Sequence, residues 1–142
     1  MLDVLAVCAL VGLAALVSIV IRRRMGVAAP TQPRLATVPS QLDRDDFDHP
    51  QSPWLVVLFS SQTCESCAKV RPMLPALASS SVAVQDVDQA LSAELHERYA
   101  IDTLPLTVVA DADGVVKCWF LGVPTATDLW AAVAEVREPG PH

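Results

Sequence analysis

Positive charge is scarce in this 142-residue chain, which has 10 lysines and arginines against 16 aspartates and glutamates. Three of the ten are the consecutive arginines at residues 22–24. Without these arginines and Asp3, 15 acidic and 7 basic residues remain, a net charge of −8. Binding to nucleic-acid phosphates needs a basic patch, and none is visible along the chain. The charge therefore argues against nucleic-acid binding and predicts repulsion from an anionic membrane surface beyond residues 22–24.

Cysteine is also sparse. The four cysteines are Cys8, Cys64, Cys67 and Cys118. Four unevenly spaced cysteines are too few for the disulfide framework of a small secreted protein, and they fit catalytic or metal chemistry better. A zinc site on Cys64 and Cys67 needs two further ligands at suitable spacing. The chain has no second Cys-x-x-Cys pair, and Cys118 and the histidines form no ligand pattern. We therefore expect no metal and no cofactor.

One long hydrophobic run stands at the N-terminus, where residues 2–21 are apolar apart from Asp3 and Ser18. About 20 apolar residues cross a bilayer as a helix. The arginines follow the run, whereas a cleaved secretory signal carries its positive charge before it. We expect a single-pass anchor in the cell membrane at residues 1–24, a linker at 25–33 and one domain at 34–138. Because basic flanks stay inside, the domain is expected in the cytoplasm.

Hydrophobic periodicity in the domain predicts alternating strands and helices. Strands are expected at residues 34–38, 54–60, 82–87, 106–110 and 115–121, with a hairpin turn at 111–114. Helices are expected at 40–47 with Ser40 as N-cap, from Cys64 to Leu77 with a kink at Pro72, at 91–99, and from Thr125 or Thr127 to Val136. The order β-α-β-α-β-α-β-β-α indicates an α/β fold whose central mixed sheet has helices on both faces.

The stretch Cys64-Glu65-Ser66-Cys67 carries the clearest chemical signal. It follows an apolar run at residues 54–59 and opens a helical pattern. Its spacing lets the two sulfurs meet across one turn, at a helix start where backbone N–H groups favour a thiolate. A strand that delivers such a pair to a helix indicates a thiol–disulfide redox site.

These features resemble the thioredoxin family over roughly residues 31–136. An apolar strand ends just before the cysteine pair, and a proline follows the second cysteine by five residues, as in the family's active-site helix. A Leu-Pro dipeptide precedes a strand where the family has a cis-proline. A turn and a glycine match those around the family's last strand. The matching positions are Pro72, Leu104, Pro105, residues 111–114 and Gly122.

The resemblance implies a thioredoxin-like fold and thiol–disulfide exchange with a protein or small-thiol partner, with electrons from a dithiol donor. Cys64, the more exposed thiol, would attack a substrate disulfide, and Cys67 would resolve the mixed disulfide. A cis Pro105 would lie against the two sulfurs and leave the backbone groups of Leu104 to a substrate chain. Gly122 would complete the groove by keeping its wall low.

Three positions outside the Cys-x-x-Cys motif depart from the family pattern. Thr63 replaces the tryptophan before the first cysteine, Leu58 replaces a buried aspartate, and Val84 replaces the lysine that partners it. The family's aspartate helps to deprotonate the resolving cysteine, so we expect slower resolution here. The groups that are candidates to take over part of this role are Ser60, Ser61, Gln62 and water.

The dipeptide between the cysteines is Glu65-Ser66 instead of Gly-Pro. A carboxylate beside Cys64 disfavours the thiolate, whereas the helix N-terminus favours it. If the carboxylate dominates, the pair is reducing, and a potential near roughly −120 mV would contradict this expectation.

The sequence leaves two alternative functions open. A membrane-tethered interaction or chaperone module would keep the fold with a weakly active dithiol, as the residues at Leu58 and Val84 suggest. A metal chaperone would use the thiols as ligands.

Many anchored bacterial relatives act outside the membrane, whereas the arginines at residues 22–24 predict a domain in the cytoplasm. Outside the motif, we expect a buried, unreactive Cys118 and a solvent-facing His96.

Overall fold

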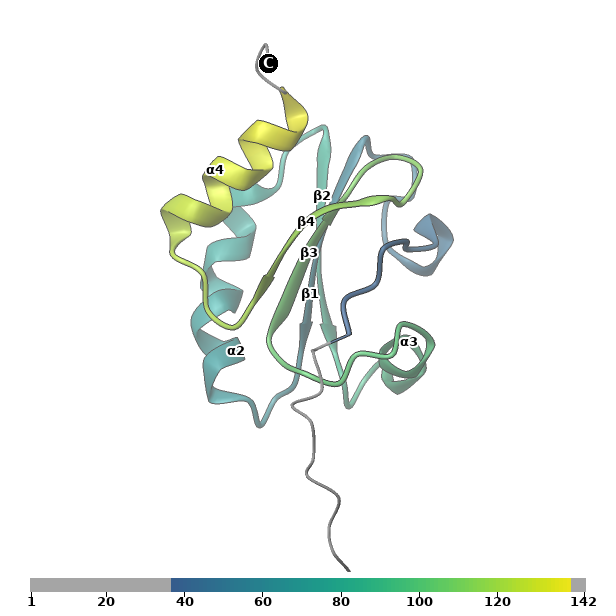
Figure 1. The fold of residues 1–142 in the computed structure, drawn as a ribbon, viewed down its shortest axis with the longest axis vertical. Helices are drawn as coiled ribbons and strands as arrows, with labels where there is room; N and C mark the ends of the chain where they lie inside the picture. Colours follow the sequence, from purple (N-terminus) through teal and green to yellow (C-terminus); the bar gives the residue numbers. More distant parts are fainter. Residues whose placement is uncertain (1–36, 139–142) are drawn as a thin grey trace, which may run out of the picture. The chain divides into compact units, whose positions relative to one another are not determined.

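The computed structural model describes residues 37–138, which form a mixed sheet with helices on both faces (Figure 1). The elements in chain order are η1 (Arg44–Asp46), β1 (Trp54–Ser60), α2 (Glu65–Val70), η2 (Arg71–Leu77), β2 (Val82–Asp88), α3 (Ala93–Arg98), β3 (Leu106–Ala110), β4 (Val116–Leu121) and α4 (Ala126–Arg137). The two η elements are 3-10 helices. The expected anchor and linker lie outside the described residues. Within the described part, no helix has the length and apolarity needed to cross a membrane.

The strand order is β2-β1-β3-β4. β1 pairs parallel to β2 and antiparallel to β3, and β4 pairs antiparallel to β3. A central strand with covered faces explains the continuous apolar run of β1, in which all residues from Leu55 to Ser60 are buried. The predicted mixed sheet and buried strand are therefore confirmed.

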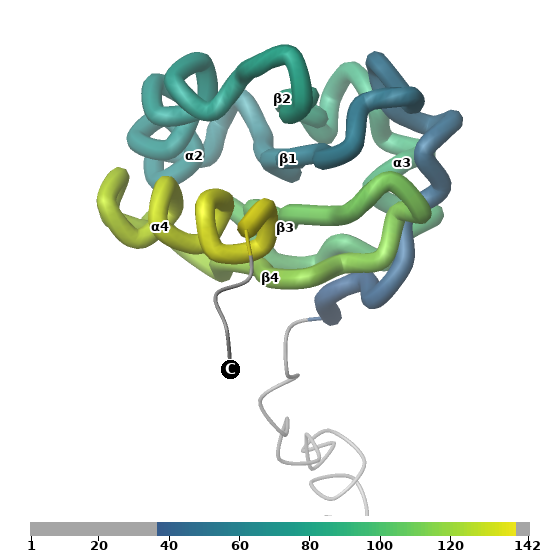
Figure 2. The backbone as a smooth tube through the Cα atoms, turned by 90° about the horizontal axis from the view of Figure 1, so that it is seen from above, coloured from purple at the N-terminus to yellow at the C-terminus, as the bar shows by residue number. Residues whose placement is uncertain are grey.

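Helices cover the two faces of the sheet unequally. Figure 2 shows α2 and α4 on one side of the strands and α3 on the other. On the α2 side, Leu58 of β1 packs in one buried cluster with Val70, Leu74 and Leu129. A second cluster on the α3 side includes Leu55, Val57 and Phe59 of β1 with Leu42, Phe47 and Ile101. Alternation along β1 thus supplies both cores.

The N-terminal part of the domain differs from the prediction. Thr37 and Val38 are not in a strand, and the rest of the expected strand at 34–38 lies outside the described residues. The expected helix at 40–47 is only the three-residue η1, capped by Asp43, whose side chain accepts the Asp45 N–H. Ser40 instead accepts the Val116 N–H through its carbonyl at 3.0 Å. Pairing with the start of β4 therefore replaces a helix start.

Two predictions for the segment at 91–99 were also wrong. The helix begins only at Ala93, and Leu91 lies before it with 77% of its surface exposed. His96 is buried, with Nε2 2.9 Å from the Val87 carbonyl and its ring edge-on to Phe59. Contact with the sheet therefore decides the environment of this histidine.

The other elements match the expected ones closely. The hairpin turn is present, since Gly114 N–H donates to the Asp111 carbonyl at 3.0 Å. Thr125 caps α4 by accepting the Asp128 N–H. The helical path after Cys64 changes from α to 3-10 geometry at Arg71, just before Pro72. A proline lacks the N–H that an α-helix needs, so this change fits the predicted kink.

Candidate functional site

At one end of the sheet, the C-terminal ends of β1, β2 and β4 lie beside the N-terminal end of β3. Ser60 at the end of β1 is the register partner of Asp88 at the end of β2. Phe59 pairs with Leu106, and Leu106 pairs with Leu121, so the residues just beyond them are adjacent too. The loop after β1, which leads to α2, therefore lies beside the loop before β3 and the loop after β4 (Figure 1).

The cysteine pair stands at the start of α2. Cys64 is the N-cap residue, and its sulfur accepts the Cys67 N–H at 3.1 Å. The two sulfur atoms are 2.13 Å apart, and the Cα atoms are 5.3 Å apart, as a disulfide. Cys64 is half-buried, whereas Cys67 has no exposed surface. Only Cys64 is thus accessible to a partner.

The motif's neighbours line the solvent side of the pair. Thr63, Glu65 and Ser66 are all exposed, and Glu65 is the first residue of α2. The Thr63 hydroxyl is 3.1 Å from that of Ser61. A partner that reaches Cys64 therefore meets a carboxylate and three hydroxyl groups.

The predicted groove residues lie at the same end of the sheet. The Leu104–Pro105 peptide bond is cis, and Pro105 is buried while Leu104 is half-buried. The Gly122 N–H donates to the Pro105 carbonyl at 2.9 Å. Gly122 has φ +87°, and a Cβ added there would meet no atom within 4 Å. The backbone conformation favours glycine at this position, and the space that a side chain would occupy is open.

The residues at the family's acid–base positions form an apolar layer. Leu58 is fully buried, and Val84 packs against the same cluster under α2. Thr107 is the register partner of Leu58 on β3. Its buried hydroxyl has no hydrogen-bond partner among residues 37–138. A polar group therefore remains beside Leu58, on the neighbouring strand.

We expect Thr107→Val to raise the free energy of unfolding by about 1 kcal/mol, because the buried, unpaired hydroxyl costs energy and valine has nearly the same shape. Urea unfolding monitored by tryptophan fluorescence measures the change. The control is Ser60→Ala, which removes an equally buried hydroxyl that has partners and should destabilise the fold. A loss of stability in Thr107→Val would show that the hydroxyl is satisfied.

Sequence reasoning missed a charged cluster beside the motif. We call Ser60, Arg71, Asp86 and Asp88 the Arg71 cluster. Arg71 Nε donates to Asp86 at 2.7 Å, and Arg71 Nη2 contacts Asp88 at 3.1 Å and donates to the Ser60 hydroxyl at 2.9 Å. The hydroxyl of Ser60 in turn donates to Asp86. The sequence offered two signals of this cluster. Asp86 and Asp88 stand at alternate positions of a strand, and Arg71 follows Cys67 by one helical turn.

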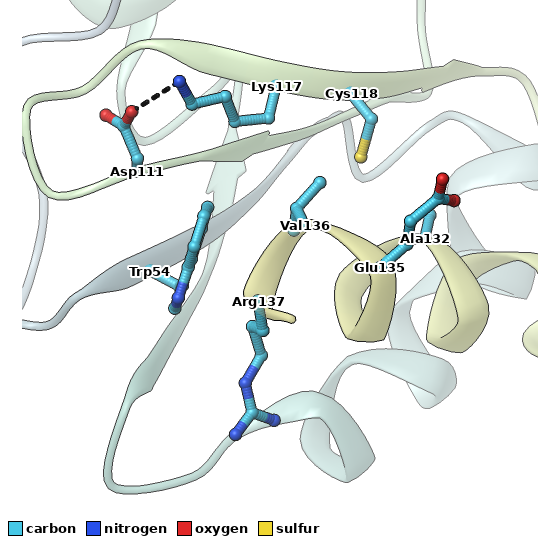
Figure 3. Close-up of a pocket in the computed structure, with 8 residues that line it drawn as sticks. All are labelled: Trp54, Asp111, Lys117, Cys118, Ala132, Glu135, Val136 and Arg137. Carbon is cyan, nitrogen blue, oxygen red and sulfur yellow. Dashed lines mark ion pairs between the residues drawn. The ribbon is translucent and has the colours of Figure 1, made fainter. Parts of the chain in front are cut away.

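Cys118 lies away from this site, in a groove of about 750 Å³ between β4 and the end of α4. Figure 3 shows its sulfur directed toward α4, near Val136 and Glu135. Burial and then the charge of Glu135 raise the pKa of the Cys118 thiol. Trp54, the first residue of β1, lines the same groove, whereas the cysteine pair follows the strand's last residue. Cys118 is therefore half-buried instead of buried as expected, and its unreactive role stays a prediction.

Metal-binding groups do not gather in the described part of the chain. Among residues 37–138, no three side chains of histidine, cysteine, aspartate or glutamate are grouped so as to hold a metal ion.

Comparisons with known proteins rest on structure alone, since no family model and no curated protein matches the chain. A single-residue mutant of thioredoxin from Halobacterium salinarum NRC-1 is similar, with a TM-score of 0.59, 20% identity, and coverage of 71% of this chain and 90% of that one. Mitochondrial thioredoxin 3 from Saccharomyces cerevisiae matches with a TM-score of 0.52 and 23% identity, over 61% of this chain and 81% of that one. Chloroplastic thioredoxin z gives 0.55 and 21%, over 61% and 80%. With Cys64 and Cys67 at disulfide distance, these matches identify the chain as a thioredoxin-fold protein.

Proposed function

We propose that the protein is a thiol–disulfide oxidoreductase that uses Cys64 and Cys67. The observation that carries this proposal is the asymmetry of the pair. One sulfur is accessible at a helix start, the other is fully buried, and the two are close enough to bond. The cis Leu104–Pro105 bond and the open wall at Gly122 lie at the same end of the sheet.

In the proposed reaction, the Cys64 thiolate attacks one sulfur of a substrate disulfide. A Cys64–substrate disulfide forms, and the other substrate sulfur leaves as a thiolate. Cys67 then attacks Cys64, which releases the second substrate thiolate and leaves the Cys64–Cys67 disulfide. The substrate gains two electrons, and the protein loses two. A dithiol donor reduces the pair again by the same exchange in reverse.

Substrates of this reaction are proteins or small disulfides. The motif residues beside Cys64 are exposed, and the space beside Gly122 at the same end of the sheet is open, which suits an extended peptide as well as a small molecule. We further propose a reducing direction, because Glu65 opposes the thiolate of Cys64.

The test is reduction of insulin by the full chain in detergent with dithiothreitol as donor. We expect precipitation of the insulin B chain well before it occurs with dithiothreitol alone. A rate equal to that of dithiothreitol alone would favour the second candidate, a thioredoxin-fold interaction or chaperone module. The apolar pair of Leu58 and Val84 is the observation behind that candidate. Stoichiometric zinc or copper in the purified protein would favour a metal chaperone instead.

We also propose that residues 2–21 anchor the protein in the cell membrane with the domain in the cytoplasm. The support is the apolar run and the three arginines that follow it. A membrane-impermeant thiol reagent applied to intact cells should leave Cys64 unlabelled until the cells are lysed. Rapid labelling in intact cells would place the domain outside.

A further inference from the structure

The Arg71 cluster closes the segment that carries both cysteines. Asp86 accepts hydrogen bonds from the Ser60 hydroxyl and from Arg71, whose guanidinium also donates to Ser60. Residues 60 and 71 are thus held together on one carboxylate, and Cys64 and Cys67 lie between them in sequence. Ser60 is fully buried, and the Asp88 side chain is 8% exposed, so these contacts are partly shielded from water.

The cluster is close to the sulfur pair in the structure as well. Arg71 is the C-cap of α2, and its backbone N–H donates to the Cys67 carbonyl. Four residues of helix correspond to about 6 Å along the axis, which is shorter than the screening length of about 10 Å at ordinary salt. The backbones of Cys67 and Arg71 thus lie within one screening length, and the charges of Arg71 and Asp86, whose side chains are 30% and 32% exposed, are only partly screened by solvent.

Few other charges lie on the described elements next to this cluster, and α4, which packs against η2, adds the exposed Asp128, Glu135 and Arg137. β1 carries none, and η2 carries none besides Arg71. Glu65 and Lys69 of α2 are both exposed to solvent. The cluster itself holds one cation and two carboxylates, a net charge of −1, so Arg71→Gln makes it more negative and Asp86→Asn makes it neutral.

The register shows how the cluster relates to the missing acid of β1. Asp86 is the partner of Leu58 on the adjacent strand. Paired residues of neighbouring strands project to the same face, so a carboxylate lies one strand away from Leu58, on the α2 side.

We propose that the Arg71 cluster sets how readily the Cys64–Cys67 pair ionises and is oxidised, with Arg71 favouring the thiolate and Asp86 opposing it. This inference rests on the proposed exchange reaction and assigns its regulation to residues outside the motif. Arg71 and Asp86 are positioning residues: they act on the sulfurs through their charge and through the closure of residues 60–71.

Neutralising the two partners separately should have opposite effects. In Arg71→Gln, the thiolate loses a nearby cation, so the midpoint pH for alkylation of Cys64 rises and the equilibrium with glutathione moves toward the Cys64–Cys67 disulfide. In Asp86→Asn, the midpoint pH for alkylation of Cys64 falls, and the equilibrium with glutathione moves toward the reduced dithiol. We expect a change of about three- to tenfold in the equilibrium constant for each variant, in opposite directions.

The readouts are the iodoacetamide alkylation rate of the full-length reduced chain against pH, followed on the Cys64 peptide by mass spectrometry, and the redox equilibrium with glutathione. Arg71→Lys keeps the charge and loses the paired geometry, so it should keep the wild-type midpoint even if stability falls. The double variant Arg71→Gln/Asp86→Asn should lie near wild type.

A matched ion pair on the α3 side provides the control. Arg98 contacts Asp46 at 2.9 Å, and neither Arg98→Gln nor Asp46→Asn should move the midpoint. Shifts of the same sign in Arg71→Gln and Asp86→Asn, or no shift in either, would overturn the inference and leave a purely structural cluster. If the wild type fails to exchange with glutathione at all, the proposed function itself fails.

Discussion

Replacing Cys64 with serine is expected to abolish disulfide reduction by the protein, lowering the rate of insulin reduction to that of dithiothreitol alone. A serine hydroxyl stays protonated at neutral pH and cannot form the mixed disulfide. Cys64 is the accessible member of the pair, and the fully buried Cys67 cannot reach a substrate in its place. The measurement is insulin turbidity with dithiothreitol as donor.

Cys118→Ser is the matched control for this experiment. Cys118 is level with Val56 near the start of β1, through Val109 of β3, whereas the motif follows the end of β1. Its raised pKa keeps it protonated at neutral pH. We expect this variant to reduce insulin at the wild-type rate. Equal activity in the wild type and Cys64→Ser, or loss of activity only in Cys118→Ser, would contradict the assignment.

Gly114→Ala is expected to produce the largest loss of stability. A Cβ at Gly114 would stand 1.9 Å from the Leu42 carbonyl oxygen, and its φ of +78° is unfavourable for alanine. The Leu42 backbone is held here, because its N–H donates to the Gly114 carbonyl at 2.8 Å. The turn must therefore move, at a cost of about 3 kcal/mol or more in the free energy of unfolding.

Gly122→Ala separates the effect of the steric clash on stability from the effect of the positive φ. Gly122 also has a positive φ, +87°, but a Cβ there meets no atom within 4 Å. Gly122→Ala should therefore lower the free energy of unfolding by only about 1 kcal/mol. Thermal unfolding of both variants measures the difference, and we expect a melting temperature lower by more than about 10 °C for Gly114→Ala than for wild type. Equal losses in the two variants would show that the approach to Leu42 is relieved without cost.

Much of the sheet was predictable because its signals are local. β1 is a continuous apolar run, and the turn at 111–114 has residues that favour a hairpin. The cysteine pair was predicted from its spacing, and the cis Leu104–Pro105 bond and Gly122 from the family resemblance. The structure places all of them at one end of the sheet. Local pattern and tertiary structure agree at these positions.

The errors occur where distant contacts override local preference. Ser40 has the properties of a helix cap, but its carbonyl pairs with Val116, 76 residues away in the chain. His96 is polar on a short helix, yet the Val87 carbonyl and the Phe59 ring provide a buried partner. The Arg71 cluster joins two strands and a helix end, and no local pattern contains its pairing with Asp86 and Asp88.

We assign attack on the substrate to Cys64 and resolution of the mixed disulfide to Cys67. Trapping of the mixed disulfide tests these two roles most directly. Reduced Cys67→Ser and Cys64→Ser are each mixed with oxidised glutathione and analysed by mass spectrometry after digestion. We expect a stable glutathione adduct on Cys64 in Cys67→Ser, because the resolving thiol is gone, and almost none on the buried Cys67 in Cys64→Ser. An adduct that forms readily on Cys67, with little on Cys64, would contradict the account.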